Sequence, residues 1–129
     1  MTREDKQLLL KDLCMRIPYR TFVCLNPGAY NKPETCILTG VDGEQVYLNV
    51  DSDPFRIDHI KPYLGPMSSM TKDERLVYEQ RHHDVGRSVD VIDADEVVSY
   101  IDWLNAHHFD FRNLIEKGLA IDCTDLNIY

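Results

Sequence analysis

The fold is decided by residues 35–50, TCILTGVDGEQVYLNV. Two apolar runs flank the dipeptide Asp42-Gly43, which favours the positive φ values of a tight hairpin. The second run alternates apolar and polar residues, which places three side chains on one face of a sheet: Val46, Leu48 and Val50. The stretch therefore predicts two antiparallel strands, over residues 35–39 and 44–50, with a short turn between them.

Two further strands are predicted on either side of this hairpin. Residues 21–25, TFVCL, are rich in β-forming residues and end at a turn signal, Asn26-Pro27-Gly28. Alternation over residues 55–60 predicts a fourth strand. Residues 61–70 contain two prolines and a glycine and are predicted to be a stiff connector. The expected sheet is a small antiparallel β-meander of three to four strands.

A first helix is predicted over residues 2–17. Thr2 is expected to cap it, and Pro18 to end it, because proline lacks a backbone donor. Its apolar residues recur at steps of three and four and form one stripe: Leu9, Leu10, Leu13, Cys14 and Ile17. This helix is expected to lie at the edge of the core.

Three more helices are predicted in the second half, which makes about four in all. Thr71 and Glu74 form a capping box before a helix over residues 72–83, whose buried candidates are Leu76, Val77 and Tyr78. The next helix begins at Asp93 with Glu96 as its box partner, and its apolar face holds Val97, Val98, Ile101, Leu104 and His108. Residues 110–117 predict a short last helix, which Asp110 caps and Gly118 ends. Together the elements predict one α+β domain over residues 1–129, sheet-rich over 1–64 and helical and acidic over 65–129.

The formal net charge is −8, and most of it lies in the second half of the chain. Residues 1–64 hold eight Lys/Arg against nine Asp/Glu, whereas residues 65–129 hold six against thirteen. An acidic surface repels phosphate, so we expect no direct binding to nucleic acid or to an anionic membrane. Five carboxylates have no Lys or Arg among them: Asp90, Asp93, Asp95, Glu96 and Asp102. They form either a solvated face or a docking surface for a basic partner.

The four cysteines predict a reducing compartment. Their spacings match no zinc or disulfide framework, and the sequence has no Cys-x-x-Cys. Residues 1–6 mix charges and do not resemble a secretory signal. No apolar run approaches the ~20 residues that span a bilayer. We therefore predict a cytoplasmic protein.

Five histidines raise the alternative of a metal site: His59, His82, His83, His107 and His108. Adjacent residues on a helix point about 100° apart, so neither adjacent pair chelates one ion efficiently. The i, i+4 spacing of metalloprotease histidines is missing from the sequence. His107 and His108 are instead predicted to cap and pack at a helix end. No catalytic, cofactor-binding or metal-ligating residue is predicted.

Three segments resemble a family of small uncharacterised proteins from gut Bacteroidales and their phages or mobile elements. These are LLLKDLCMRIPY at residues 8–19, IKPYLGPMSSMT at residues 60–71 and WLNAHHFDFRNLIEKGLA at residues 103–120. The resemblance covers about a third to a half of the chain. It implies no activity, ligand or catalytic residue, and a phage-like origin fits a small acidic accessory protein.

The sequence therefore predicts a non-enzymatic interaction or regulatory protein whose partner is a protein, with a basic surface as the expected match. The predicted binding residues are the five carboxylates together with Trp103, the only tryptophan. A lone tryptophan is either core packing or a binding hot spot. The alternative function is a small enzyme or metal-binding protein that uses the clustered His and Asp residues.

Overall fold

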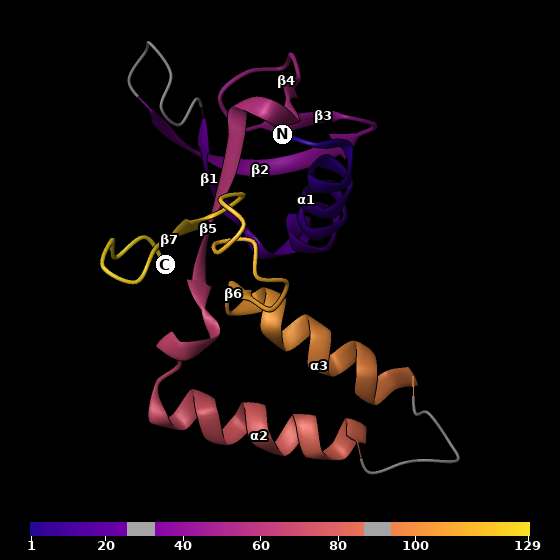
Figure 1. Cartoon of the computed structure of the whole chain (residues 1–129), viewed down its shortest axis with the longest axis vertical. Coiled ribbons are helices and arrows are strands. Elements are labelled where there is room, and N and C mark those ends of the chain that lie inside the picture. Colours follow the sequence, from indigo (N-terminus) through magenta and orange to yellow (C-terminus); the bar gives the residue numbers. More distant parts are fainter. Residues whose placement is uncertain (26–32, 87–93) are drawn as a thin grey trace.

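The computed structural model describes residues 1–25, 33–86 and 94–129. Within these residues, three α-helices and a seven-stranded, mostly antiparallel sheet form an α+β fold (Figure 1). The strands follow the order β4-β3-β2-β1-β5-β6, and β7 pairs with β5. The predicted fold class is confirmed, while the predicted number of three to four strands is too low.

The predicted meander forms the first part of the sheet. Its antiparallel strands are β1 (Phe22–Leu25), β2 (Glu34–Asp42), β3 (Gln45–Leu48) and the short β4 (Phe55–Arg56). The hairpin between β2 and β3 turns at Gly43, whose φ of +61° suits glycine. Val46 and Leu48 are buried as predicted, but Val50 lies beyond the end of β3 and is half exposed.

The predicted connector is wrong, because most of it is a central strand, β5 (Ile60–Pro66). A 3-10 helix, η2 (Ile57–His59), leads into β5. The strand pairs antiparallel with β1 and parallel with two short strands from the far end of the chain, β6 (Phe109–Asp110) and β7 (Ile121–Asp122). Three buried apolar side chains, Ile60, Tyr63 and Leu64, outweigh the one ladder donor that Pro62 lacks.

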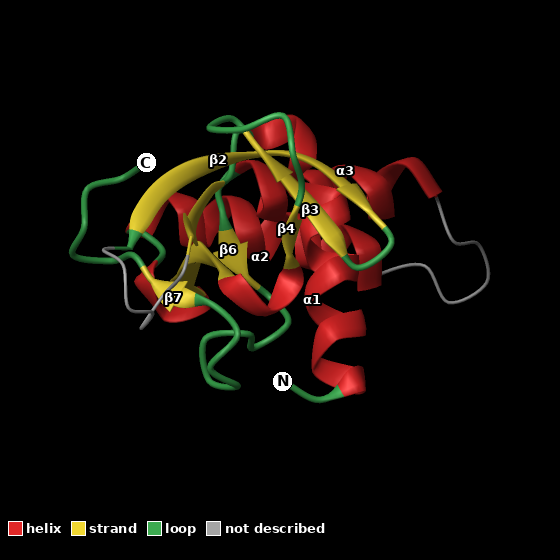
Figure 2. Cartoon of the chain, turned by 90° about the horizontal axis from the view of Figure 1, so that it is seen from above, coloured by secondary structure: helices red, strands yellow, loops and turns green. Residues whose placement is uncertain are grey.

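The first helix, α1 (Arg3–Arg16), packs against β2 (Figures 1 and 2). Its cap is confirmed: the Asp5 N–H donates to the Thr2 hydroxyl over 3.1 Å. A 3-10 helix, η1 (Ile17–Tyr19), follows it. The predicted apolar stripe is only partly correct, since Leu9 and Leu13 enter the core but Cys14 is exposed.

Leu10 and Ile17 pack against the core from its margin, and two charged residues of α1, Asp12 and Arg16, are fully buried beside it. Arg16 Nε and Nη2 donate to the two Asp12 carboxylate oxygens over 2.7 and 3.0 Å, and neither residue keeps exposed surface. Arg16 Nη2 also donates to the Phe109 carbonyl over 2.8 Å, and Arg112 Nη1 approaches Asp12 at 3.2 Å. This ion cluster of Asp12, Arg16 and Arg112 ties α1 to the last quarter of the chain.

A pair of helices lies beyond the end of β5 (Figure 1). A 3-10 helix, η3 (Met67–Ser69), leads from β5 into α2 (Lys72–Gly86), and α3 (Ala94–Ala106) packs against α2. The capping box of α2 is confirmed: the Glu74 N–H donates to the Thr71 hydroxyl, and the Thr71 N–H donates to the Glu74 carboxylate. The predicted start of α3 at Asp93 lies outside the described residues.

The predicted helix over residues 110–117 is instead a series of turns. Asn113 has a φ of +58°, a left-handed conformation that an α-helix does not accommodate. Asp110 therefore caps no helix; its carboxylate instead accepts the N–H groups of Leu114 and Ile115, both over 2.9 Å, and so stabilises the turns. Leu114 and Leu119 then enter the same core as α1 and the sheet.

Candidate functional site

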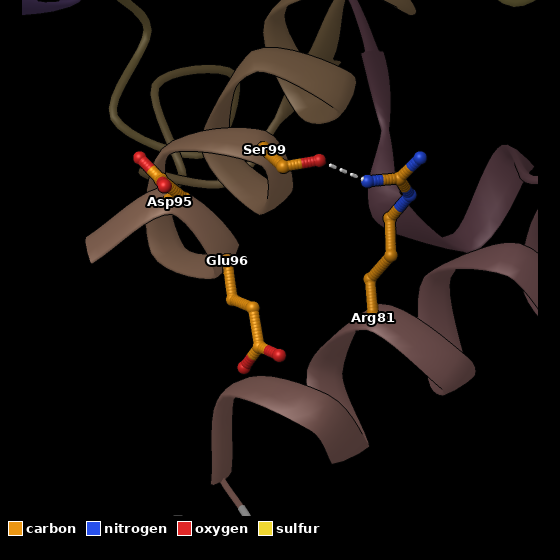
Figure 3. A pocket seen from close by; sticks show the side chains of 4 residues that line it. All are labelled: Arg81, Asp95, Glu96 and Ser99. Atoms are coloured by element: carbon orange, nitrogen blue, oxygen red, sulfur yellow. Dashed lines mark hydrogen bonds between the residues drawn. The ribbon is translucent and has the colours of Figure 1, made fainter. Parts of the chain in front are cut away.

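The candidate site is a groove between α2 and α3, with a volume of about 260 Å³ (Figure 3). It is lined by Arg81 of α2 and by Asp95, Glu96 and Ser99 of α3. Figure 3 shows Arg81 reaching across the groove, where its Nη1 donates a hydrogen bond to the Ser99 hydroxyl. In the same view Glu96 extends toward α2, and Asp95 points away from Arg81.

Aromatic side chains hold the two helices together beside this groove. The Tyr100 ring of α3 lies 5.9 Å from both the Tyr78 and the His82 rings of α2, and its hydroxyl is 3.3 Å from His82 Nδ1. Burial, followed by the Tyr78 hydroxyl, raises the pKa of Tyr100, so its phenol stays neutral. Near the sheet, His107 Nδ1 lies 3.5 Å from a Glu74 carboxylate oxygen. The groove therefore lies between two helices that are held together by side-chain contacts.

Exposed apolar side chains flank the groove on α2. Leu76 is 59% exposed and Val77 is 40% exposed, so the prediction that both are buried is wrong. With Gln80 and Arg81 they line a second hollow of about 530 Å³. Arg81 lines both hollows, so the two hollows adjoin at this side chain. We call the surface formed by the helical hairpin of α2 and α3 the hairpin surface. Its residues are Leu76, Val77, Gln80, Arg81, Asp95, Glu96 and Ser99.

Of the six predicted binding residues, the structure describes four, and these four do not all line the groove. Asp95 and Glu96 line the groove, whereas Asp90 and Asp93 lie outside the described residues. Asp102 lies beside Tyr19 of η1, where burial and then this carboxylate raise the pKa of the Tyr19 phenol. Trp103 is half-buried, with ring centroids 4.6 Å from His107 and 5.9 Å from Phe109. Trp103 is thus a packing residue at the base of the helix pair.

The histidines lie in separate places. His59 is exposed in η2, His82 contacts Tyr100, and His107 contacts Trp103 and Glu74. His83 belongs to α2, but its side chain is not among those that the structure describes. In residues 1–25, 33–86 and 94–129, no group of three or more His, Cys, Asp or Glu side chains is placed to hold a metal ion.

The surroundings of His108 lower the pKa of its imidazole. Burial, followed by the positive charges of Arg16 and His107, lowers this pKa from the ordinary 6.5 to about 4. Its ring stacks on Tyr129 with centroids 3.6 Å apart. His108 therefore packs as predicted, but it is neutral at pH 7 and its Nδ1 has no hydrogen-bond partner among the described residues, so the predicted capping by its imidazole is wrong.

The chemistry of the hairpin surface suits binding. It offers a guanidinium, two carboxylates, a hydroxyl and two exposed aliphatic side chains. Sequence reasoning missed Arg81, Ser99 and the exposure of Leu76 and Val77, because an apolar pair on a helix was assigned to the core. The available signal was the spacing of Val77 and Arg81, which places them on one face of α2.

Comparison of the chain with family models, with curated proteins and with solved structures found no match. Among the helices that the structure describes, none has the length and apolar character needed to cross a bilayer.

Proposed function

We propose that this chain is a non-enzymatic accessory protein that binds a basic protein partner through the hairpin surface. The observation that carries the proposal is the exposure of Leu76 and Val77 directly beside a groove with two carboxylates. Contiguous exposed apolar patches rimmed by polar residues mark interaction sites, and Leu76 and Val77 are adjacent exposed aliphatic side chains beside charged groups. The resemblance to proteins of phages and mobile elements supports the accessory role.

The two parts of the surface have different tasks in this proposal. Covering Leu76 and Val77 removes apolar surface from water and supplies affinity. Asp95 and Glu96 lie where a Lys or Arg of the partner is attracted, and such rim charges act mainly on the association rate. The partner segment that fits is an amphipathic helix with aliphatic residues on one face and Lys or Arg beside them.

The test uses a defined probe, a synthetic amphipathic helix with Leu at i and i+4 and Lys on the flanks. Binding is measured by calorimetry and by amide chemical shifts at low and physiological salt. Leu76→Ser is expected to weaken binding about tenfold, since it removes roughly 1.5 kcal/mol of apolar burial. Asp95→Lys is expected to slow association and to flatten the salt dependence.

Leu126→Ser is the matched control, because Leu126 is 49% exposed but lies away from the helix pair. It should leave binding unchanged. A peptide with Glu in place of Lys should bind at least tenfold more weakly. The proposal would be contradicted by an affinity that changes neither with Leu76→Ser nor with salt. Amide chemical-shift changes confined to residues outside α2 and α3 would also contradict it.

A further inference from the structure

The Tyr129 side chain fills a slot at the end of the ladder between β1 and β5. One face of its ring stacks on the His108 imidazole, with centroids 3.6 Å apart and an angle of 11° between the planes. The Phe22 ring of β1 closes a second side, with its centroid at 5.3 Å. His108 is neutral, so the stack carries no buried charge. Tyr129 keeps 47% of its surface exposed, and the slot therefore opens to solvent.

The hydroxyl of Tyr129 continues the ladder between two strands. Val23 of β1 pairs with Pro62 of β5, and one step further Phe22 stands opposite Tyr63. At this step the Phe22 N–H donates to the Tyr129 hydroxyl over 2.8 Å, and that hydroxyl donates to the Tyr63 carbonyl over 2.9 Å. One backbone donor and one backbone acceptor at the end of the β1–β5 ladder are thus both satisfied by a phenol.

The walls of the slot are fixed by bonds that do not involve Tyr129. The His108 N–H donates to the Asn105 carbonyl over 3.0 Å, and the Gly65 N–H donates to the His108 carbonyl over 2.9 Å. Phe22 and Tyr63 belong to paired strands. By contrast, the residues that connect β7 to Tyr129 are mostly exposed. The slot is thus built by the sheet and by the end of α3.

We propose that this slot is a binding site for the phenol group of a tyrosine side chain, occupied in cis by Tyr129. A phenol is the matching ligand, because it combines a flat apolar ring with a hydroxyl that accepts and donates one hydrogen bond. A benzyl group fills the same volume but leaves the Phe22 N–H and the Tyr63 carbonyl unpaired. The site therefore selects tyrosine over phenylalanine, and Tyr129 competes with any tyrosine presented from outside.

Tyr129→Ala with p-cresol, the tyrosine side chain cut at its Cβ atom, tests the site. In the full-length variant, p-cresol is expected to return the Phe22 amide resonance toward its wild-type position, with a dissociation constant of about 1 mM. Toluene, which lacks the hydroxyl, is expected to bind at least tenfold more weakly. Tyr129→Phe is the matched control, because its ring still fills the slot and should exclude p-cresol.

If Tyr129→Ala is largely unfolded, the same titration is followed by circular dichroism, where p-cresol but not toluene should restore the folded signal. Three outcomes would overturn the proposal. These are a Phe22 amide that does not respond to p-cresol, an equal response to toluene, and an equal response in Tyr129→Phe.

Discussion

His108 combines three constraints in one residue. It follows α3 with a φ of +60°, its ring stacks on Tyr129, and its charged form is disfavoured by burial, Arg16 and His107. Few residues adopt a positive φ readily, and histidine is among those enriched there. The His108 ring is therefore neutral, and the backbone of the same residue has a positive φ that most residues avoid.

The stability of the fold should therefore fall as the pH falls from 6.5 to 4. In this range the unfolded chain protonates His108 while the folded chain, with a pKa of about 4, does not. The unfolded state binds more protons, so the free energy of unfolding decreases with falling pH. We expect about 1–2 kcal/mol from this residue, less than the full shift implies because the ring retains some contact with solvent.

Urea unfolding of the wild type and of His108→Asn at pH 7 and pH 5 measures this contribution. Asparagine accepts a positive φ and does not titrate, so the variant loses the His108 share of the pH dependence while the carboxylates keep theirs. Equal pH dependence in the two proteins would contradict the assignment.

At the residue scale, local bonds were predictable from the sequence and distant ones were not. Thr2 and the Thr71–Glu74 box bond to groups three residues away, and a short window contains all that is needed. Arg16 bonds to Phe109 across 93 residues, and helical spacing gives no sign of it. The contacts of Asp102 with Tyr19 and of Tyr129 with Phe22 also join residues far apart in the sequence, so local patterns did not predict them.

The helix α2 is held by polar bonds at its first turn and by aromatic contacts with α3. Its apolar residues Leu76 and Val77 are exposed, so packing against the sheet contributes little to it. The capping box at Thr71 and Glu74 supplies two backbone bonds at its first turn, and Arg75 Nη2 donates to the Met67 carbonyl over 3.0 Å. The start of α2 is therefore fixed by polar bonds.

Replacing Thr71 by Ala should loosen α2 before it affects the rest of the protein. The variant leaves the Glu74 N–H without its side-chain acceptor, at a cost of about 1 kcal/mol. Amide hydrogen exchange should become roughly fivefold faster along α2 and stay unchanged in β2. Thr71→Ser keeps the hydroxyl and serves as the control. An equal loss of protection in β2 would mean that α2 is not an independent element.

At the element scale, periodicity predicted the hairpin of β2 and β3 and the helices α1 and α3, whereas α2 was predicted from its capping box. Periodicity missed β6 and β7, which have two residues each and exist only because β5 offers them partners. The prolines of β5 indicated a connector. The segment forms a strand because the apolar residues beside Pro62 are buried in the core. In residues 110–117 the apolar spacing indicated a helix, and the left-handed Asn113 prevents one.

The whole molecule is joined across its two halves by the ion cluster of Asp12, Arg16 and Arg112. We predict that Asp12→Ala lowers the free energy of unfolding by about 3–5 kcal/mol, since it leaves the fully buried Arg16 without its counter-charge. Hydrogen exchange in β2 and in α3 should rise together, because the sequence predicts a single domain over residues 1–129. The double variant Asp12→Ala, Arg16→Met should recover part of the loss. Loss of protection confined to residues 65–129 would contradict the single-domain prediction.

The Phe109 carbonyl, which accepts a hydrogen bond from Arg16, is synthesised long after Arg16 itself, and this delay affects folding on the ribosome. Ribosomes add roughly 5–20 residues per second, so Phe109 is made roughly 5–20 seconds after Arg16, from which it is separated by 93 residues. A nascent chain can form α1 and the β2–β3 hairpin in that interval, but the guanidinium has only Asp12 and water to bind. The parallel partners of β5 are translated last, and the sheet is completed only when they emerge. Completion of the fold therefore waits for translation of residues 109–122, and a stop codon before Phe109 would release a chain in which the Arg16 guanidinium has no Phe109 carbonyl to bind.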